Sequence, residues 1–295
     1  MESEHGDLSF FVSQLYALAA KLEGEGQYNL AKLERCAADA ICRQAAYGLE
    51  MPSNREELAA EVKNSAGAIS ELNTSPELVE AILHGAEIMA DGQLPFIDVA
   101  PNPYLCRYCG YVTLTRPAVN CPNCSARPDT FKLFNPVYWL DRFDPFEVMI
   151  RLEQTPADLA VLLDGLSEDQ MSRIPQEDGW NVRNAVSHLR DAQGVLEFRV
   201  KLMLEQDNPR LESKAVFEWA ADEADRPASV EEIFRTYRDS RLKTIAILEE
   251  LPLAEWWRKG QHEEFGEVTI TQQASYFAAH ELTHFPQIEK LVDNL

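Results

Sequence analysis

Four cysteines arranged in two Cys-x-x-Cys hooks are the residues whose types and spacing most directly indicate chemistry. The first hook is Cys106-Arg-Tyr-Cys109 and the second is Cys121-Pro-Asn-Cys124, with eleven residues between them. Each hook places two thiolates on one tight turn, and the intervening chain is long enough to return. Four sulfur ligands suit tetrahedral zinc or iron rather than magnesium or calcium. The hooks therefore predict a metal site, with unpaired or redox-active thiols as the alternative.

The residues around the hooks narrow the choice of metal. Gly110 and Pro122 follow the first turns of the hooks, and aromatic residues such as Tyr111 and Phe131 flank them. In these features, residues 103–134 resemble the rubredoxin-like module of rubrerythrins. The resemblance implies an iron ion bound by four cysteines and able to pass one electron. Zinc in the same ligands would be structural, so the expected cofactor of this knuckle is iron or zinc.

Three histidines could form a second centre. His280 and His284 lie on the apolar stripe of an expected helix, four residues apart, so their rings can converge on one point. His188 lies at the shoulder of the apolar stripe of another expected helix. Three imidazoles leave positions open on zinc, nickel or another divalent metal, where a water or a thiol loses its proton more easily. The alternative is that each histidine is a satisfied core residue.

Short motifs along the C-terminal half point to a family. They are Gly179-Trp180-Asn181-Val182-Arg183 before His188-Leu189, Trp256-Trp257, Gly266 with Val268-Thr269, and His280-Glu281-Leu282-Thr283-His284 with Gln287-Ile288. In this order they resemble the DinB-like (damage-inducible, metal-binding) family over about residues 145–293. The resemblance implies a four-helix bundle with a divalent metal on three histidines, which map onto His188, His280 and His284. Related members are thiol transferases using bacillithiol, mycothiol or glutathione, or thiol-dependent isomerases.

The string His280-Glu281-x-x-His284 is also that of zincin proteases, in which the glutamate acts as general base. Zincins usually take a third ligand well downstream, but only eleven residues follow His284. The helical pattern also lacks the substrate-binding sheet that normally precedes the zincin helix. Glu281 lies one helical step off the ligand face, where it either supports the site or is an ordinary solvated glutamate. We assign no catalytic residue.

Helices must position these residues. Apolar periodicity predicts helices over about 8–22, 28–48, 55–71 and 76–90, and again over 145–165, 181–206, 229–250 and 270–293. Asn181 is expected to cap one of the later helices, and Ser229 with Glu232 and Thr269 with Gln272 form capping boxes. Thr155-Pro156 is expected to break the helix over 145–165. Cys36 and Cys42, six residues apart on one helix, are expected to be reduced, buried thiols.

The expected fold class is mainly α, in three regions. Residues 1–92 form a helical region, residues 93–135 a linker with a small rubredoxin-like or zinc-ribbon knuckle, and residues 144–295 a DinB-like four-helix bundle. The first region lacks the Glu-x-x-His pairs of di-iron bundles, so peroxidase activity is not predicted.

The net negative charge disfavours two classes of binding partner. The 295 residues carry a net charge of −22, which disfavours binding to nucleic acid and to anionic membranes. No apolar run is long enough to span a bilayer, and the acidic start is unlike a signal peptide, so we expect a cytoplasmic protein. A homodimer is compatible with the sequence.

Two functions remain open. In the first, the bundle is a metal-dependent thiol transferase: its metal lowers the pKa of a low-molecular-weight thiol, which attacks an electrophile. In the second, the protein is a non-enzymatic redox or stress-response module, with the knuckle passing electrons. No conspicuous nucleophile accompanies the three histidines, so any reaction would use water or an external thiol.

Overall fold

The structure is a computed structural model that describes residues 2–71, 75–135, 143–174, 180–212 and 228–295. Two compact units divide the chain. The first unit contains residues 1–93 and 103–132, and the second contains residues 94–102 and 133–295. The four-cysteine knuckle thus belongs to the same unit as the N-terminal helices, whereas the segment before it belongs to the second unit. The predicted domain boundaries themselves stay predictions.

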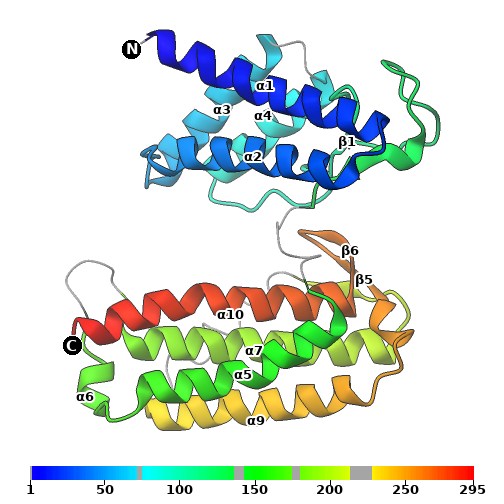
Figure 1. Ribbon diagram of the computed structural model, residues 1–295. Coiled ribbons are helices and arrows are strands. Elements are labelled where there is room, and N and C mark those ends of the chain that lie inside the picture. Colours follow the sequence, from blue (N-terminus) through cyan, green and yellow to red (C-terminus); the bar gives the residue numbers. More distant parts are fainter. Residues whose placement is uncertain (1, 72–74, 136–142, 175–179, 213–227) are drawn as a thin grey trace. The chain divides into compact units, whose positions relative to one another are not determined.

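Two helical hairpins make up most of the first unit. Helix α1 (Glu2–Gly24) packs against α2 (Tyr28–Tyr47), and α3 (Arg55–Glu71) packs against α4 (Pro76–Ala90) (Figure 1). Where the side chains of these helices are described, the buried residues are all alanines, which lets neighbouring backbones approach closely: Ala19, Ala31, Ala38, Ala59, Ala66 and Ala86. Cys36 and Cys42 are free but exposed, so the prediction that they are buried was wrong.

The knuckle completes the first unit. Strands β1 (Tyr104–Cys106), β2 (Val112–Thr113) and β3 (Phe131–Leu133) form one small sheet in the order β2-β1-β3. The first two strands pair antiparallel. The chain between β1 and β2 is the first cysteine hook, so the sheet holds that hook as a hairpin turn.

Four long helices form the second unit: α5 (Pro145–Leu163), α7 (Val182–Glu205), α9 (Val230–Glu249) and α10 (Ile270–Asp293). Helix α10 packs against α5 and α7, and α9 packs against the same two, so α5 lies diagonally across from α7 (Figure 1). A short helix α6 (Glu168–Met171) precedes α7. The predicted mainly helical fold with a C-terminal four-helix bundle is confirmed. None of the described helices is both long and apolar enough to cross a membrane.

Side-chain caps fix where the bundle helices begin. Capping boxes with both reciprocal hydrogen bonds open α7 at Asn181, α9 at Ser229 and α10 at Thr269. Each cap satisfies a backbone N–H of the first turn, which has no partner within the helix. The predicted starts of these three helices therefore agree with the structure. Gly179, the first residue of the motif before α7, lies outside the described residues.

Helix α5 runs through Pro156 without the predicted break. Proline lacks the N–H that would bind the carbonyl oxygen four residues earlier, which here belongs to Leu152. That oxygen instead accepts a hydrogen bond of 3.1 Å from the buried Arg241 of α9. The prediction was wrong because a side chain from a neighbouring helix satisfies the carbonyl that the proline leaves free.

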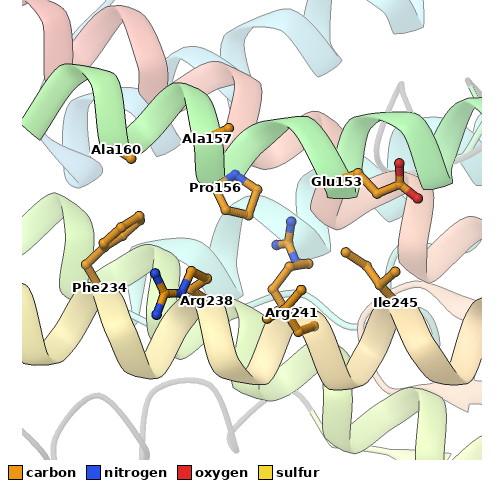
Figure 2. A pocket seen from close by; sticks show the side chains of 9 residues that line it. Glu153, Pro156, Ala157, Ala160, Phe234, Arg238, Arg241 and Ile245 are labelled. Carbon is orange, nitrogen blue, oxygen red and sulfur yellow. The ribbon is translucent and has the colours of Figure 1, made fainter.

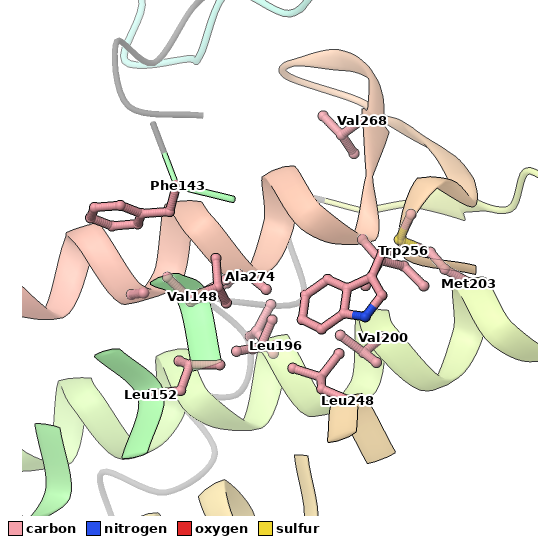
Figure 3. Close-up of a cluster of buried hydrophobic side chains, with 14 of the residues drawn as sticks. Phe143, Val148, Leu152, Leu196, Val200, Met203, Leu248, Trp256, Val268 and Ala274 are labelled. Carbon is pink, nitrogen blue, oxygen red and sulfur yellow. The ribbon is translucent and has the colours of Figure 1, made fainter. Parts of the chain in front are cut away.

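Two apolar clusters fill the bundle. One lies around Trp256 and takes side chains from α5, α7, α9 and α10, including Leu152, Leu196, Leu248 and Ala274 (Figure 3). The other surrounds the buried Tyr237 and contains residues such as Leu189 and Ile288. Both clusters contain side chains from several helices. Burial of this apolar surface therefore fixes how the helices that carry the histidines face one another.

A small sheet closes one end of the bundle. Strands β5 (Lys259–His262) and β6 (Gly266–Thr269) pair antiparallel, and β4 (Arg210–Leu211) pairs parallel with β5. The His262 ring is 3 % exposed and its Nδ1 accepts the N–H groups of Glu264 and Phe265. Gly266, at φ +76°, packs against Ile97, so the segment before the knuckle covers this turn.

We predict that His262 makes the fold acid-sensitive. Burial, and then the positive charge of Arg199, lower the pKa of His262 from 6.5 to about 3. Below pH 6.5 the unfolded chain binds a proton at this residue that the folded chain refuses, so stability falls as pH falls from 6.5 toward 3. In denaturant titrations, wild type should lose about 2 kcal/mol more than His262→Asn between pH 7 and pH 5.

The matched control is His84→Asn, since His84 is an exposed histidine of the first unit. It should show the wild-type pH dependence. An equal loss of stability in wild type and His262→Asn would contradict this account of the hairpin.

Candidate metal centres

The four predicted cysteines come together in the knuckle. Their sulfur atoms all lie within 4.8 Å of one another. Cys106 Sγ lies 3.6 Å from Cys124 Sγ, and Cys109 Sγ lies 3.6 Å from Cys121 Sγ. A tetrahedral ion with metal–sulfur bonds of about 2.3 Å would separate its sulfur ligands by about 3.8 Å. This spacing fits one ion and is far longer than a disulfide bond, and all four cysteines are free.

The two hooks share one backbone design. The Cys106 and Cys121 carbonyls accept N–H bonds from Gly110 and Ser125, both of which have positive φ. The N–H groups of the same two cysteines bond back to carbonyls across the turn. Each turn thus holds its two sulfurs on one side before any ion binds. Gly110 tolerates this backbone freely, whereas Ser125 adopts it at a conformational cost.

Charge also favours a cation in the knuckle. Burial acts to raise the pKa of Cys109, but hydrogen bonds from the Tyr111 backbone and neighbouring side chains lower it to about 7. The Ala126 backbone acts to lower the pKa of Cys124, yet burial and the other three thiols raise it overall. One thiolate therefore forms readily while another resists ionisation. Four thiolates at this spacing need a positive ion between them.

The three predicted histidines also meet. His188 comes from α7, and His280 and His284 come from successive turns of α10. The Nε2 atom of His280 lies 3.2 Å from that of His188 and 3.1 Å from that of His284. Ligands about 2.05 Å from one ion would be about 2.9 Å apart at right angles and about 3.3 Å apart in a tetrahedron. The observed separations fall between these values, so the three residues fit a divalent metal.

The environment keeps these rings available as ligands. Burial, and then neighbouring histidines, lower the pKa of His280 to about 4 and also lower that of His188. Neutral imidazoles are the form that binds a metal. The Oε1 atom of Gln287 lies 2.9 Å from His284 Nδ1, which places the proton on Nδ1 and leaves Nε2 free. No role was predicted for Gln287, although its position three residues after His284 indicates that the two side chains can meet.

Two aromatic rings border the three-histidine centre. Trp180 packs edge-on to His188 with ring centroids 5.6 Å apart, and Tyr276 lies 5.9 Å from His280. The histidines themselves are partly exposed. Their recorded polar partners, in the described part of the chain, are one another and Gln287.

Glu281 is buried, so of the two alternatives left open by the sequence, the solvated glutamate is excluded. Its side chain is 0 % exposed and pairs with the equally buried Arg241 of α9. Arg241 also donates to Gln193 of α7 and to the Leu152 carbonyl of α5. The sequence signal was an arginine on the apolar stripe of α9, where Ile233, Tyr237 and Ile245 are buried around it. Glu281 thus anchors the helix turn that carries His280.

A pocket of about 540 Å³ lies between α5 and α9. Figure 2 shows Pro156 of α5 facing α9 across it, with Phe234, Arg241 and Ile245 of α9 on the opposite side. The histidines lie on the other two helices, α7 and α10. This pocket is therefore separate from the three-histidine centre.

Comparisons with known proteins concern the second unit. Residues 151–288 match the sequence profile of the DinB superfamily. They form a DinB superfamily domain. The resemblance predicted over about residues 145–293 is thus confirmed for most of that span, while the likeness of the knuckle to rubredoxin stays a prediction.

Relatives of the DinB domain carry names that refer to a metal. The chain is 27 % identical over 137 residues to a protein of Geobacillus kaustophilus named "Putative metal-dependent hydrolase GK0616", which covers 46 % of this chain and 77 % of that protein. It is 24 % identical over 140 residues to "Putative metal-dependent hydrolase OB0782" of Oceanobacillus iheyensis, covering 48 % and 81 %.

A remote structural likeness also covers this part of the chain. The solved structure is titled "YfiT from Bacillus subtilis is a probable metal-dependent hydrolase with an unusual four-helix bundle topology". It is 19 % identical with a TM-score of 0.44, covering 53 % of this chain and 92 % of that one.

We predict that Glu281→Gln destabilises the DinB domain by about 3–5 kcal/mol, because it leaves the buried Arg241 charge without a carboxylate. Chemical denaturation monitored by tryptophan fluorescence measures this change. Glu289→Gln, at an exposed position of the same helix, is the matched control and should change stability by less than about 0.5 kcal/mol. Equal effects of the two substitutions would show that the pair does not anchor α10.

Proposed function

We propose that the DinB domain is a metal-dependent thiol S-transferase whose metal is held by His188, His280 and His284. The observation that carries this proposal is the convergence of three Nε2 atoms at a partly exposed position. A divalent ion such as zinc or nickel bound there would lower the pKa of a thiol or water in its open coordination positions. The nucleophile is a low-molecular-weight thiol and its partner is a small electrophile.

The chain's own residues prepare this chemistry. Gln287 fixes the tautomer of His284, and burial keeps His280 unprotonated at neutral pH. The rings of Trp180 and Tyr276 give the centre apolar walls that restrict water. The Arg241–Glu281 pair holds the turn of α10 that presents His280.

Hydrolysis is the second candidate, with water in place of the thiol. The names of the curated relatives, which call them metal-dependent hydrolases, favour it. Both reactions need the same three histidines and the same open positions, so they differ only in which nucleophile the site accepts. The two are separated by whether turnover requires an added thiol.

The knuckle has a different role in this proposal. Four sulfurs surround a single position and leave no ligand position open, which is the pattern of a structural zinc or an electron-transfer iron site. If the knuckle holds iron and the DinB domain has no turnover, the protein is the redox module that the sequence left open.

We predict that His284→Ala removes metal from the DinB domain and lowers thiol-transfer turnover about 100-fold or more, because two imidazoles bind a divalent ion far more weakly than three. The assay follows glutathione, bacillithiol or mycothiol with a chromogenic aryl chloride, using the metal-loaded full chain. Cys121→Ser should empty the knuckle and leave turnover intact. His84→Ala, at an exposed histidine of the first unit, should change neither.

Turnover that survives His284→Ala would contradict the proposed centre. Hydrolysis of an activated ester without any thiol, abolished by His284→Ala, would replace thiol transfer by the second candidate. Loss of both metals in either variant would show that the sites are not independent.

A further inference from the structure

Arg199 is a buried cation on α7. Its side chain is 3 % exposed. It donates from Nη1 to Gln273 Oε1 at 3.1 Å and from Nη2 to the Glu212 carbonyl at 3.0 Å. Both acceptors are neutral. Arg199 takes part in none of the ion pairs recorded for the described residues, unlike the other buried arginine, Arg241. A buried charge without an anion in contact is unfavourable, so this position favours a bound anion.

Gln273 on α10 supplies a second donor without an acceptor. Its side chain is 0 % exposed, and its Nε2 group has no hydrogen-bond partner among the residues that the structure describes. The amide cannot be turned over to solve this, because its NH₂ group would then face the guanidinium, which only donates. Most buried polar groups are hydrogen-bonded, so the free NH₂ group marks a place for an acceptor. Arg199 and Gln273 contact each other, so the guanidinium charge and the unpaired amide NH₂ group lie at one position.

Glu264 lies near Arg199 and its charge favours the protonated guanidinium, but the described residues form no ion pair with Arg199. The charge of Arg199 still acts on the buried His262, where it adds to the effect of burial in lowering the pKa. Glu264 is near enough to be influenced by Arg199, yet burial raises the pKa of its carboxyl group overall. Tyr276 and Glu264, both partly exposed, are the groups through which solvent approaches this position.

The subsite is separate from the three histidines. Gln273 precedes His280 by two turns of α10, and Arg199 follows His188 by three turns of α7. The distance along the helices is therefore roughly 10–16 Å. Both sets of residues nonetheless lie on the same seam between α7 and α10, because each set joins those two helices.

We propose that Arg199 and Gln273 form a binding subsite for the carboxylate group of a small organic ligand. One guanidinium charge matches a monoanion, and the guanidinium edge together with the amide NH₂ group offers donors to two oxygens. A phosphate dianion would carry excess charge and would face Glu264. A water molecule would satisfy the amide but would leave Arg199 without an anionic hydrogen-bond partner. The subsite depends neither on a metal at the histidines nor on thiol chemistry.

The test supplies the carboxylate from within the chain. Gln273→Glu places an anion beside Arg199 and should raise the melting temperature by about 2–4 °C. The matched control is Gln261→Glu, which adds the same charge at an exposed position of β5 and should give no rise. A melting temperature of Gln273→Glu at or below that of wild type would overturn the proposal, because Arg199 would then need no counter-charge.

Binding is measured with butanoate and its neutral analogue butanamide by calorimetry on the full chain. Wild type should bind butanoate about tenfold or more tightly than butanamide, and Gln273→Glu and Arg199→Met should lose this preference. Arg210→Met, which removes an exposed arginine, should keep it. Equal binding of the two probes by wild type, or a preference that survives Gln273→Glu, would overturn the proposal.

Discussion

The buried guanidinium of Arg241 joins all four helices of the DinB domain. From α9 it donates to the Leu152 carbonyl on α5, to Gln193 on α7 and to Glu281 on α10. A buried ion pair adds little net stability over apolar packing, but removal of one partner is strongly unfavourable. The network therefore specifies one register of the helices, and that register brings His188 opposite His280 and His284.

The sequence could predict the features that depend on local contacts, but not those that depend on the Arg241 network. Local signals sufficed for the helix starts, because the caps at Asn181, Ser229 and Thr269 bind backbone groups only three residues away. The i, i+4 spacing of His280 and His284 also predicted that they share a face. The continuation of α5 through Pro156 could not be predicted locally, since it depends on Arg241, which lies 89 positions from Leu152 in the chain.

Burial of polar side chains was the other limit. The burial of Glu281 could not be predicted from the sequence, because a lone charged residue usually lies at the surface. Its partner Arg241 lies on another helix, and the pairing of two charges on separate apolar stripes becomes evident only once the helices are packed. The prediction for Cys36 and Cys42 was wrong in the opposite sense, because both were expected to be buried. Alanines, rather than larger apolar residues, fill the contacts of the first unit and leave both thiols exposed.

The two ligand sets differ in what they leave open. The knuckle surrounds one position with four sulfurs, whereas the histidines contribute three nitrogens and remain partly exposed. This contrast separates a ligand set that encloses its position, in the first unit, from one that leaves its position partly open, in the DinB domain.

The most direct test of this account is the number of metal ions per chain, measured by native mass spectrometry with elemental analysis of the purified protein. The account predicts two ions: zinc or iron in the knuckle and a second divalent ion, such as zinc or nickel, in the DinB domain. A single ion held by the cysteines, with none bound when divalent metal is added in excess, would contradict it.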